Sequence, residues 1–376
     1  MIPEPRGDFY AVPEPLPPGE PGDVIWAQPI AAPRDAVAWR VLYHSRSVQG
    51  ADIAVSGLVV APDGPPPSEG FPVVAVAHGT TGLADECAPS KEAVPLRRGQ
   101  ARTGSLSLPP LWTLGYVVAA TDYEGLGTPG RHPYLVGVSE GRGVLDSIRA
   151  ARALPGARAS SQAVVVGGSQ GGHAALFAGE IAAEYAPDVA LAGIVALAPG
   201  AELAHAALLL SSEPSAVGFA VAIGAGFAAA YPEADLERVL TPYARRLLSV
   251  VDRGCIDDVL STFAKPVDQV LRLEEIVKPP WPALLEENTP GRVATPVPIF
   301  VGQGGADPLV VPELTDALVA RLCAIGNDVT YRRYAGAGHV DIVSAAATDV
   351  EAWIRARFEG RAEGPSTVAG TSPCPD

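Results

Sequence analysis

The segment from Val164 to Leu176 constrains the fold of this chain more than any other feature of the sequence. Its residues are Val-Val-Val-Gly-Gly-Ser-Gln-Gly-Gly-His-Ala-Ala-Leu, so a β-branched strand leads through Gly-x-Ser-x-Gly into an alanine-rich helix. This order is typical of a nucleophile elbow, which lifts a serine above a sheet. Glycines at 167 and 171 leave no Cβ to clash where Ser169 adopts a strained backbone. The flanking strand and helix favour this interpretation over a tight turn with an incidental serine.

The same turn predicts half of an oxyanion hole. The Gln170 N–H and the helix N-terminus point to the place where negative charge would develop. A second donor is expected from the loop that follows the apolar run 73–77, which begins with His78 and Gly79. The Thr80 N–H, helped by its own hydroxyl or by Thr81, would complete the hole. His78 is then expected to be structural.

A serine hydroxyl is a weak nucleophile, so it needs a histidine base and an acid that orients the base. In this fold the chain order is serine, acid, histidine. The chain has six histidines, His44, His78, His132, His173, His205 and His339. Only His339 lies late enough, in a glycine-rich loop before the last predicted helix. A surface loop histidine is the alternative, and His173 is expected to pack under the elbow.

Asp307 is the best-placed acid, because it follows the predicted strand 298–302 within Gln-Gly-Gly-Ala-Asp-Pro. Asp316, Asp328 and Asp341 lie in helical or strand-flanking positions. The segment 121–130 also follows a predicted strand. Within it, Tyr123 or Glu124 could line the part of a substrate pocket that holds the acyl group or the leaving group. Thr81 in the earlier loop could do the same. A simple loop without contact to substrate is an equal alternative for 121–130.

Hydrophobic periodicity predicts an α/β fold. Apolar runs indicate strands at 41–47, 53–61, 73–77, 117–121, 163–167, 194–198, 298–302 and 329–334. Apolar spacings of three or four indicate helices at 143–153, 170–185, 312–325 and 341–358. Strands that alternate with helices imply a mostly parallel sheet that is covered on both faces.

The pattern also predicts how the chain is divided. Residues 1–38 are proline-rich and are expected to form an extended arm on the core. The core itself would comprise 39–200 and 292–360, and 361–376 would be a surface tail. Residues 201–291 show helical stretches at 201–211, 216–230, 233–248 and 256–264 without a clear strand. We expect them to form a cap over the carboxyl edge of the sheet, where ligands bind in open α/β folds. Apolar runs at 206–210 and 217–230 would supply an acyl pocket, although such runs are more often merely core.

Composition excludes several classes of protein. A hydrophobic content of 48% with 18% charged residues excludes a disordered chain. The formal net charge of −15 argues against nucleic acid and anionic membranes as partners, because these need clustered lysine and arginine. The longest apolar stretch, 217–231, is too short and too rich in glycine for a stable membrane span.

The ends and the cysteines bear on the compartment. At the N-terminus no basic segment is followed by an apolar stretch, so no signal peptide is visible. Met1 is the only methionine and would suit a start codon added to a processed form. The four cysteines permit three pairings and are compatible with two disulfides in an oxidising compartment. Four buried thiols are the alternative. Their spacing predicts no metal site.

Four motifs in order, at 77–82, 122–127, 167–172 and 336–339, resemble the bacterial branch of the secretory lipase family, the Candida antarctica lipase A-like group of α/β-hydrolases. The resemblance implies an α/β-hydrolase fold with a helical cap, ester hydrolysis without a cofactor, and export. The family's triad falls on Ser169, Asp307 and His339.

The resemblance also implies disulfides Cys87–Cys255 and Cys323–Cys374. The first would tie the loop after the oxyanion strand to the cap. Because no export signal is visible, a secreted location is inferred from the resemblance and from the cysteine count.

The resulting hypothesis is a secreted serine carboxylesterase or lipase that uses an acyl-enzyme. Its substrate would be a small-molecule or lipid ester, and the cap is a candidate for transient contact with a lipid interface. The chain would need no metal or cofactor and would bind no nucleic acid. The alternatives are an acyltransferase with the same acyl-enzyme, a catalytically inactive binding protein, and an amidase or peptidase.

Overall fold

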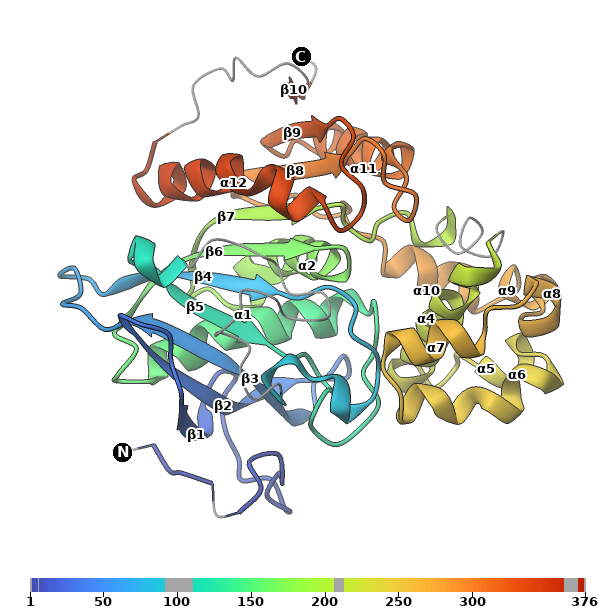
Figure 1. Ribbon diagram of the computed structural model, residues 1–376, viewed down its shortest axis with the longest axis horizontal. Coiled ribbons are helices and arrows are strands. Elements are labelled where there is room, and N and C mark those ends of the chain that lie inside the picture. The colour runs from blue at the N-terminus through green and yellow to red at the C-terminus, as the bar shows by residue number, and fades with distance from the viewer. Residues whose placement is uncertain (1, 6, 92–110, 206–212, 362–370, 375–376) are drawn as a thin grey trace.

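One mixed β-sheet forms the centre of the molecule. The computed structural model describes residues 2–5, 7–91, 111–205, 213–361 and 371–374 (Figure 1). Within them the strand order is β1-β2-β3-β5-β4-β6-β7-β8-β9-β10. The strands are β1 (Val24–Ile30), β2 (Ala36–Arg46), β3 (Asp52–Pro62), β4 (Phe71–Ala77), β5 (Val117–Thr121), β6 (Ala159–Gly168), β7 (Ala190–Leu197), β8 (Ile299–Gly304), β9 (Val329–Tyr334) and β10 (Thr371–Pro373).

The middle of the sheet is parallel and its edges are antiparallel. Neighbours from β5 through β4, β6, β7 and β8 to β9 pair in parallel. Strands β1, β2 and β3 pair antiparallel, as do β3 with β5 and β9 with β10. Buried parallel strands are rich in valine, isoleucine and alanine because both faces are covered. The predicted α/β-hydrolase fold class is therefore confirmed.

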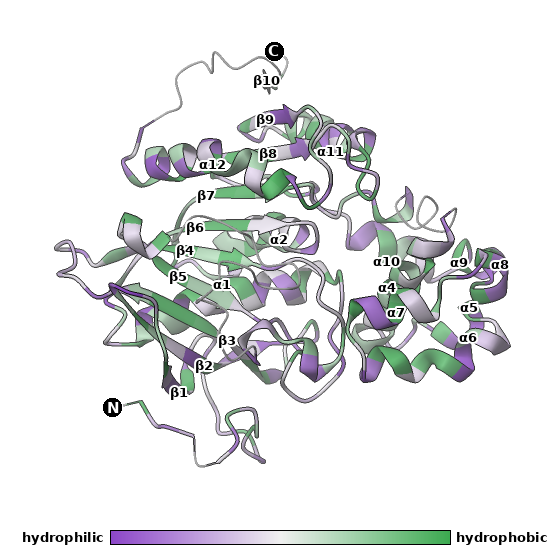
Figure 2. Cartoon of the chain, viewed as in Figure 1, coloured by the Kyte–Doolittle hydropathy of each residue, from purple (hydrophilic) through white to green (hydrophobic). Residues whose placement is uncertain are grey.

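Helices cover both faces of this sheet. Val165 of β6 belongs to the hydrophobic cluster on the side of α1 (Gly137–Ala153) and α2 (Gln170–Tyr185). Its neighbours Val164 and Val166 belong to the opposite cluster, with residues of α12 (Ile342–Phe358). This alternation follows from the two-residue period of a strand. In Figure 2 the hydrophobic residues follow the central strands, β5 to β7. A further helix, α11 (Pro312–Ala324), lies between β8 and β9 in the chain.

A second group of helices lies beyond the carboxyl ends of the parallel strands (Figure 1). These helices are α4 (Val217–Ala230), α5 (Leu236–Val239), α6 (Pro242–Leu247), α7 (Ile256–Thr262), α8 (Val267–Val270), α9 (Leu273–Ile276) and α10 (Trp281–Glu287). They share a hydrophobic cluster of their own, in which Phe227, Phe263 and Trp281 meet Leu83 and Tyr134 of the core loops. We call residues 213–291 the helical cap.

The structure departs from the sequence predictions at both ends of the chain. Residues 24–30 form the edge strand β1, which the sequence analysis did not predict within the arm 1–38. Pro29 interrupts the strand pattern, and an edge strand tolerates a proline because one side of its backbone needs no partner. In the tail, β10 pairs with β9. The predicted apolar run 206–210 lies outside the described residues.

Helix α1 begins at Gly137, earlier than the predicted start at 143. A Cβ at Gly141 would lie 3.0 Å from the Ala178 backbone nitrogen, so this glycine allows α1 to approach α2 closely. The predicted helix 233–248 is divided into α5 and α6. Among the helices of the described residues, none combines the length and the apolarity that crossing a membrane requires.

Candidate active site

The turn between β6 and α2 holds Ser169 in a conformation that depends on its glycines. Ser169 has φ 57° and ψ −120° and forms the N-cap of α2. A Cβ at Gly167 would lie 1.9 Å from the Gly171 carbonyl oxygen, and a Cβ at Gly171 would lie 1.9 Å from the Ala77 carbonyl oxygen. Both positions therefore require glycine for steric reasons, and the strained serine is a feature of functional turns.

The structure brings Ser169, His339 and Asp307 into one hydrogen-bonded chain. The His339 Nε2 atom lies 2.9 Å from the Ser169 Oγ atom, and its Nδ1 atom lies 2.7 Å from the Asp307 Oδ2 atom. Asp307 follows β8, and His339 lies between β9 and α12. All three residues therefore extend from the carboxyl edge of the parallel strands, where open α/β sheets bind ligands.

The surroundings of Asp307 fix its carboxylate. Its side chain is fully buried. Its Oδ1 atom accepts hydrogen bonds from the backbone N–H groups of Leu309, at 2.8 Å, and Val310, at 2.9 Å. A carboxylate only accepts, so the His339 Nδ1 atom carries a hydrogen and the Nε2 atom is left to face the Ser169 hydroxyl. This arrangement can remove a proton from the serine hydroxyl.

The predicted oxyanion residues lie at the same place. Thr80, Ser169 and Gln170 line one cavity. Gln170 is the first residue of α2, so its backbone N–H has no acceptor within the helix. The Thr80 hydroxyl lies 2.8 Å from the Tyr134 hydroxyl, a contact that the sequence analysis did not anticipate.

The cavity over Ser169 is small and mainly apolar. Its volume is about 50 Å³. The other lining residues are Tyr134, Leu135, Gly200, Ala201, Leu203, Phe219, Ile223, Leu309, Val310 and Leu314. Phe219 and Ile223 belong to α4 of the cap, so core and cap both contribute to the cavity.

The three residues predicted to line a pocket do not line this cavity. Tyr123 is fully buried, and its positive φ of 72° places its ring between His78 and His132, where its hydroxyl donates to the His78 carbonyl oxygen. The Glu124 carboxylate accepts a hydrogen bond from the Ser139 hydroxyl at 2.5 Å. The buried Thr81 uses its carbonyl oxygen to accept from the Ile256 N–H of the cap.

Two other histidines near the elbow have structural partners, as predicted. The His78 Nδ1 atom lies 2.7 Å from the Gly79 carbonyl oxygen. His173 lies on α2, fully buried, with its Nδ1 atom 2.8 Å from the Glu140 Oε2 atom and its Nε2 atom 2.8 Å from the Asn288 carbonyl oxygen. The contact with Glu140 had no signal in the sequence.

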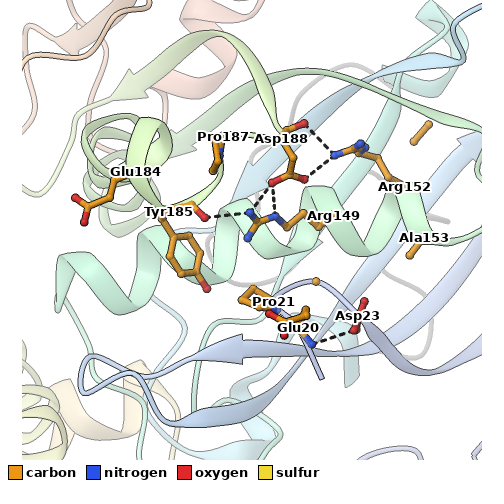
Figure 3. A pocket seen from close by; sticks show the side chains of 12 residues that line it. Glu20, Pro21, Asp23, Arg149, Arg152, Ala153, Glu184, Tyr185, Pro187 and Asp188 are labelled. Atoms are coloured by element: carbon orange, nitrogen blue, oxygen red, sulfur yellow. Dashed lines mark hydrogen bonds and ion pairs between the residues drawn. The ribbon is translucent and has the colours of Figure 1, made fainter. Parts of the chain in front are cut away.

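A larger cavity, of about 860 Å³, lies between the turn at residues 20–23 and the ends of α1 and α2 (Figure 3). Its two arginines, Arg149 and Arg152, both bind the Asp188 carboxylate, and Arg149 also donates to the Tyr185 carbonyl oxygen. All three nitrogen atoms of the Arg149 guanidinium thus donate within the protein, and the Asp188 carboxylate also neutralises Arg152. The smaller cavity at Ser169 is therefore the candidate active site, because it contains the hydrogen-bonded serine and histidine, although the other cavity has the larger volume.

Two disulfides connect distant parts of the chain. Cys87 is bonded to Cys255, which precedes α7 of the cap, and Cys323 of α11 is bonded to Cys374. These are the pairings that the resemblance implies. The first lies beside the oxyanion loop, where Gly82 forms an isolated bridge with Cys255.

A family model and two similar proteins all point to lipases. The family model described as secretory lipase matches residues 94–365. A probable inactive lipase of Mycobacterium tuberculosis (strain CDC 1551 / Oshkosh) is 27% identical and covers 94% of this chain and 82% of its own length. Lipase A of Moesziomyces aphidis is 25% identical over 98% of this chain and 83% of its own length.

Among solved structures, Candida antarctica lipase A in its closed state has a TM-score of 0.82 at 23% identity. The match covers 100% of this chain and 90% of that one. At this identity the likeness concerns the fold.

Proposed function

Because the chain belongs to the secretory lipase family and is a carboxylic ester hydrolase, we propose that it hydrolyses esters through an acyl-enzyme on Ser169. The observation that carries this proposal is the position of His339, whose ring bridges the Ser169 hydroxyl at 2.9 Å and the Asp307 carboxylate at 2.7 Å. A base that contacts both the nucleophile and an orienting acid is the requirement for activating a serine.

The reaction proceeds in two halves. The Ser169 Oγ atom attacks the ester carbonyl while the His339 Nε2 atom takes its proton, and Asp307 stabilises the imidazolium. The backbone N–H groups of Gln170 and Thr80 donate to the oxyanion of the tetrahedral intermediate. His339 then protonates the departing alcohol, and water cleaves the acyl-enzyme by the same proton transfers.

The lining of the cavity supports an apolar acyl group. Side chains from α4 and from the loop after β8 surround the serine with carbon atoms, as in sites for small-molecule or lipid esters. We include in the proposal that the helical cap, the described part of the predicted cap 201–291, acts as a lid with transient contact to a lipid interface. Two disulfides support an oxidising, extracellular compartment.

Family membership favours hydrolysis over transfer of the acyl group to an alcohol. Since one relative is named a probable inactive lipase, the main competing hypothesis is a binding protein on the same scaffold. The intact Ser169–His339–Asp307 hydrogen bonds support activity in this chain.

Turnover of p-nitrophenyl butyrate tests the proposal. We expect Ser169→Ala to lower kcat by about 10⁴-fold or more, as loss of a serine nucleophile does. The matched control is Ser261→Ala, which removes an exposed hydroxyl from α7 of the cap and should leave kcat unchanged. Undiminished hydrolysis by the folded Ser169→Ala variant would remove the proposed nucleophile, and no hydrolysis by wild type would favour a binding protein.

A further inference from the structure

A cluster of buried polar residues lies directly behind the elbow. It consists of Gln170 and His173 on α2, Glu140 on α1, His132 before α1, and Asn288 after α10, each at most 2% exposed. We call these five residues the elbow cluster. Buried polar groups are costly unless they are hydrogen-bonded, so their arrangement requires an explanation.

The side-chain amide of Gln170 uses both of its hydrogens within this cluster. Its Nε2 atom donates to the Glu140 Oε1 atom at 2.8 Å and lies 2.8 Å from the His132 Nε2 atom. The His132 Nδ1 atom faces the Glu124 carbonyl oxygen at 2.8 Å, so it carries the hydrogen and Nε2 is the acceptor. Burial lowers the pKa of His132 to about 4, which keeps its ring neutral. These two bonds hold the Gln170 side chain in one orientation.

The second carboxylate oxygen of Glu140 is hydrogen-bonded to His173 of α2, at 2.8 Å from the His173 Nδ1 atom. The His173 Nε2 atom faces the Asn288 carbonyl oxygen, which can only accept, so Nε2 carries a hydrogen. The bond between the His173 Nδ1 atom and the Glu140 Oε2 atom then contains one shared proton.

Glu140 also connects the elbow to neighbouring segments. Its Oε1 atom accepts from the Leu135 N–H at 3.0 Å, and Leu135 lines the cavity. Asn288 accepts from the Gly137 N–H at the start of α1 and donates to the Tyr231 hydroxyl of the cap. The elbow cluster thus joins α1, α2 and the cap around the residue that follows the nucleophile.

We infer that Glu140 is a positioning residue for ester hydrolysis, which fixes the oxyanion donor of Gln170 by holding its side chain. This inference rests on the proposed function, since it takes the Gln170 N–H as an oxyanion donor. Gln170 is the first residue of α2, so the two bonds to its amide tie the N-terminus of this helix, where the N–H lies, to α1 and to the loop of His132. Misplacing a catalytic group by about 1 Å can cost 10²-fold in rate.

The first test compares removal of two buried carboxylates from the same helix. Asp146 is as buried as Glu140, but it binds Ser45, Tyr185 and Arg149, away from the elbow. We expect Glu140→Ala to lower kcat for p-nitrophenyl butyrate by about 30-fold to 100-fold with KM changed less than threefold, in line with the cost of a disturbed oxyanion donor. Asp146→Ala should lower the melting temperature and leave kcat within about twofold.

A conservative variant separates hydrogen bonding from bulk structure. In Glu140→Gln the amide oxygen can replace Oε1, and the amide N–H can donate to Nδ1 of neutral His173. All bonds of the elbow cluster are then retained without a charge. We expect kcat within about threefold of wild type, because net hydrogen-bond contributions are small when partners are preserved. A loss equal to that of Glu140→Ala would overturn the inference.

A third variant keeps the inference falsifiable if Glu140→Ala does not fold. Gln170→Met has a side chain of similar length without donors, so it should lower kcat about as much as Glu140→Ala, again with little change in KM. Unchanged kcat in Gln170→Met, or equal losses in Glu140→Ala and Asp146→Ala, would contradict a positioning role. The proposed function is tested separately: undiminished hydrolysis by the Ser169→Ala variant would contradict it, whatever the Glu140 variants show.

Discussion

At the scale of single residues, backbone sterics set the geometry of the turn that carries Ser169. A methyl group at Gly167 or Gly171 would collide with a carbonyl oxygen of the neighbouring backbone, not with a flexible side chain. The turn that holds Ser169 at a positive φ brings the backbone at Gly167 and Gly171 against neighbouring carbonyl oxygens, so neither position has room for a side chain. The strained backbone of Ser169 and the close backbone contacts of the two glycines therefore occur in the same turn.

Gly171→Ala tests this steric requirement. Its Cβ would lie 1.9 Å from the Ala77 carbonyl oxygen, so β4 and α2 must separate. We expect the free energy of unfolding to fall by about 3 kcal/mol or more, at the upper end of overpacking costs. Gly64→Ala is the matched control, because no atom lies within 4 Å of its Cβ position. Equal urea midpoints for the two variants would contradict the steric account.

The candidate triad residues could be selected from sequence, whereas Glu140 could not. A local motif marks Ser169, and the order of groups in this fold leaves one histidine and favours one aspartate. Glu140 gains its role from Gln170 and His173, which lie 30 and 33 residues away in the chain. The prediction that Tyr123 or Glu124 lines a pocket was wrong for a different reason. Loop dihedrals decide whether a side chain faces a cavity or the core, and the sequence does not give them.

At the scale of elements, the Cys87–Cys255 disulfide connects the oxyanion loop to the cap. The bond spans 168 residues, while Cys323–Cys374 spans 51. The Thr81 carbonyl oxygen also accepts from the Ile256 N–H at 2.9 Å. The first disulfide therefore restrains the segment next to Thr80, and the second restrains a helix and a tail at the far edge of the sheet.

Serine substitution of each disulfide should separate stability from catalysis. A chain-entropy model attributes about 5 kcal/mol to the longer loop and about 4 kcal/mol to the shorter one. Both double variants should therefore melt at lower temperature. We expect Cys87→Ser with Cys255→Ser to lower kcat about tenfold as well, because Thr80 is less well held. The double variant Cys323→Ser with Cys374→Ser should leave kcat within about twofold. Equal losses of kcat in the two double variants would show that the Cys87–Cys255 disulfide has no special role in catalysis.

The elements of the buried sheet were predicted better than those at its edges. The second half of β6, residues 163–168, has no polar side chain and is fully buried, and this pattern depends only on burial of both faces. The edge strand β1 contains a proline and has one partner, β2, so its pattern is weak. The start of α1 was missed because its glycines serve helix packing, which a single sequence does not reveal.

At the scale of the whole molecule, two hydrophobic cores meet over the candidate site. The sheet and its helices form one body, and the helical cap has a separate cluster that reaches Tyr134 and Leu135 below it. The cavity between them is about 50 Å³, compared with about 150 Å³ for a protein cavity that accepts benzene. This volume is small for an acyl chain of several carbons, and Phe219 and Ile223 of α4 are among the side chains that limit it.

Phe219→Ala tests the part of the cap that limits this space. We expect kcat/KM for p-nitrophenyl octanoate, relative to the butyrate, to rise about tenfold, since pocket fit of this kind changes selectivity by 10-fold or more. Phe358→Ala is the control, because that ring packs on Tyr116, away from the cavity. An unchanged ratio in Phe219→Ala would show that α4 does not limit the acyl group.

Rapid mixing of the wild-type protein with p-nitrophenyl butyrate, followed by acid quenching and mass spectrometry of the peptides, tests the acyl-enzyme most directly. We expect a butyryl group on the peptide that contains Ser169, formed as p-nitrophenol is released and lost at the rate of turnover. Steady hydrolysis with no adduct, or with the adduct on another residue, would contradict the account.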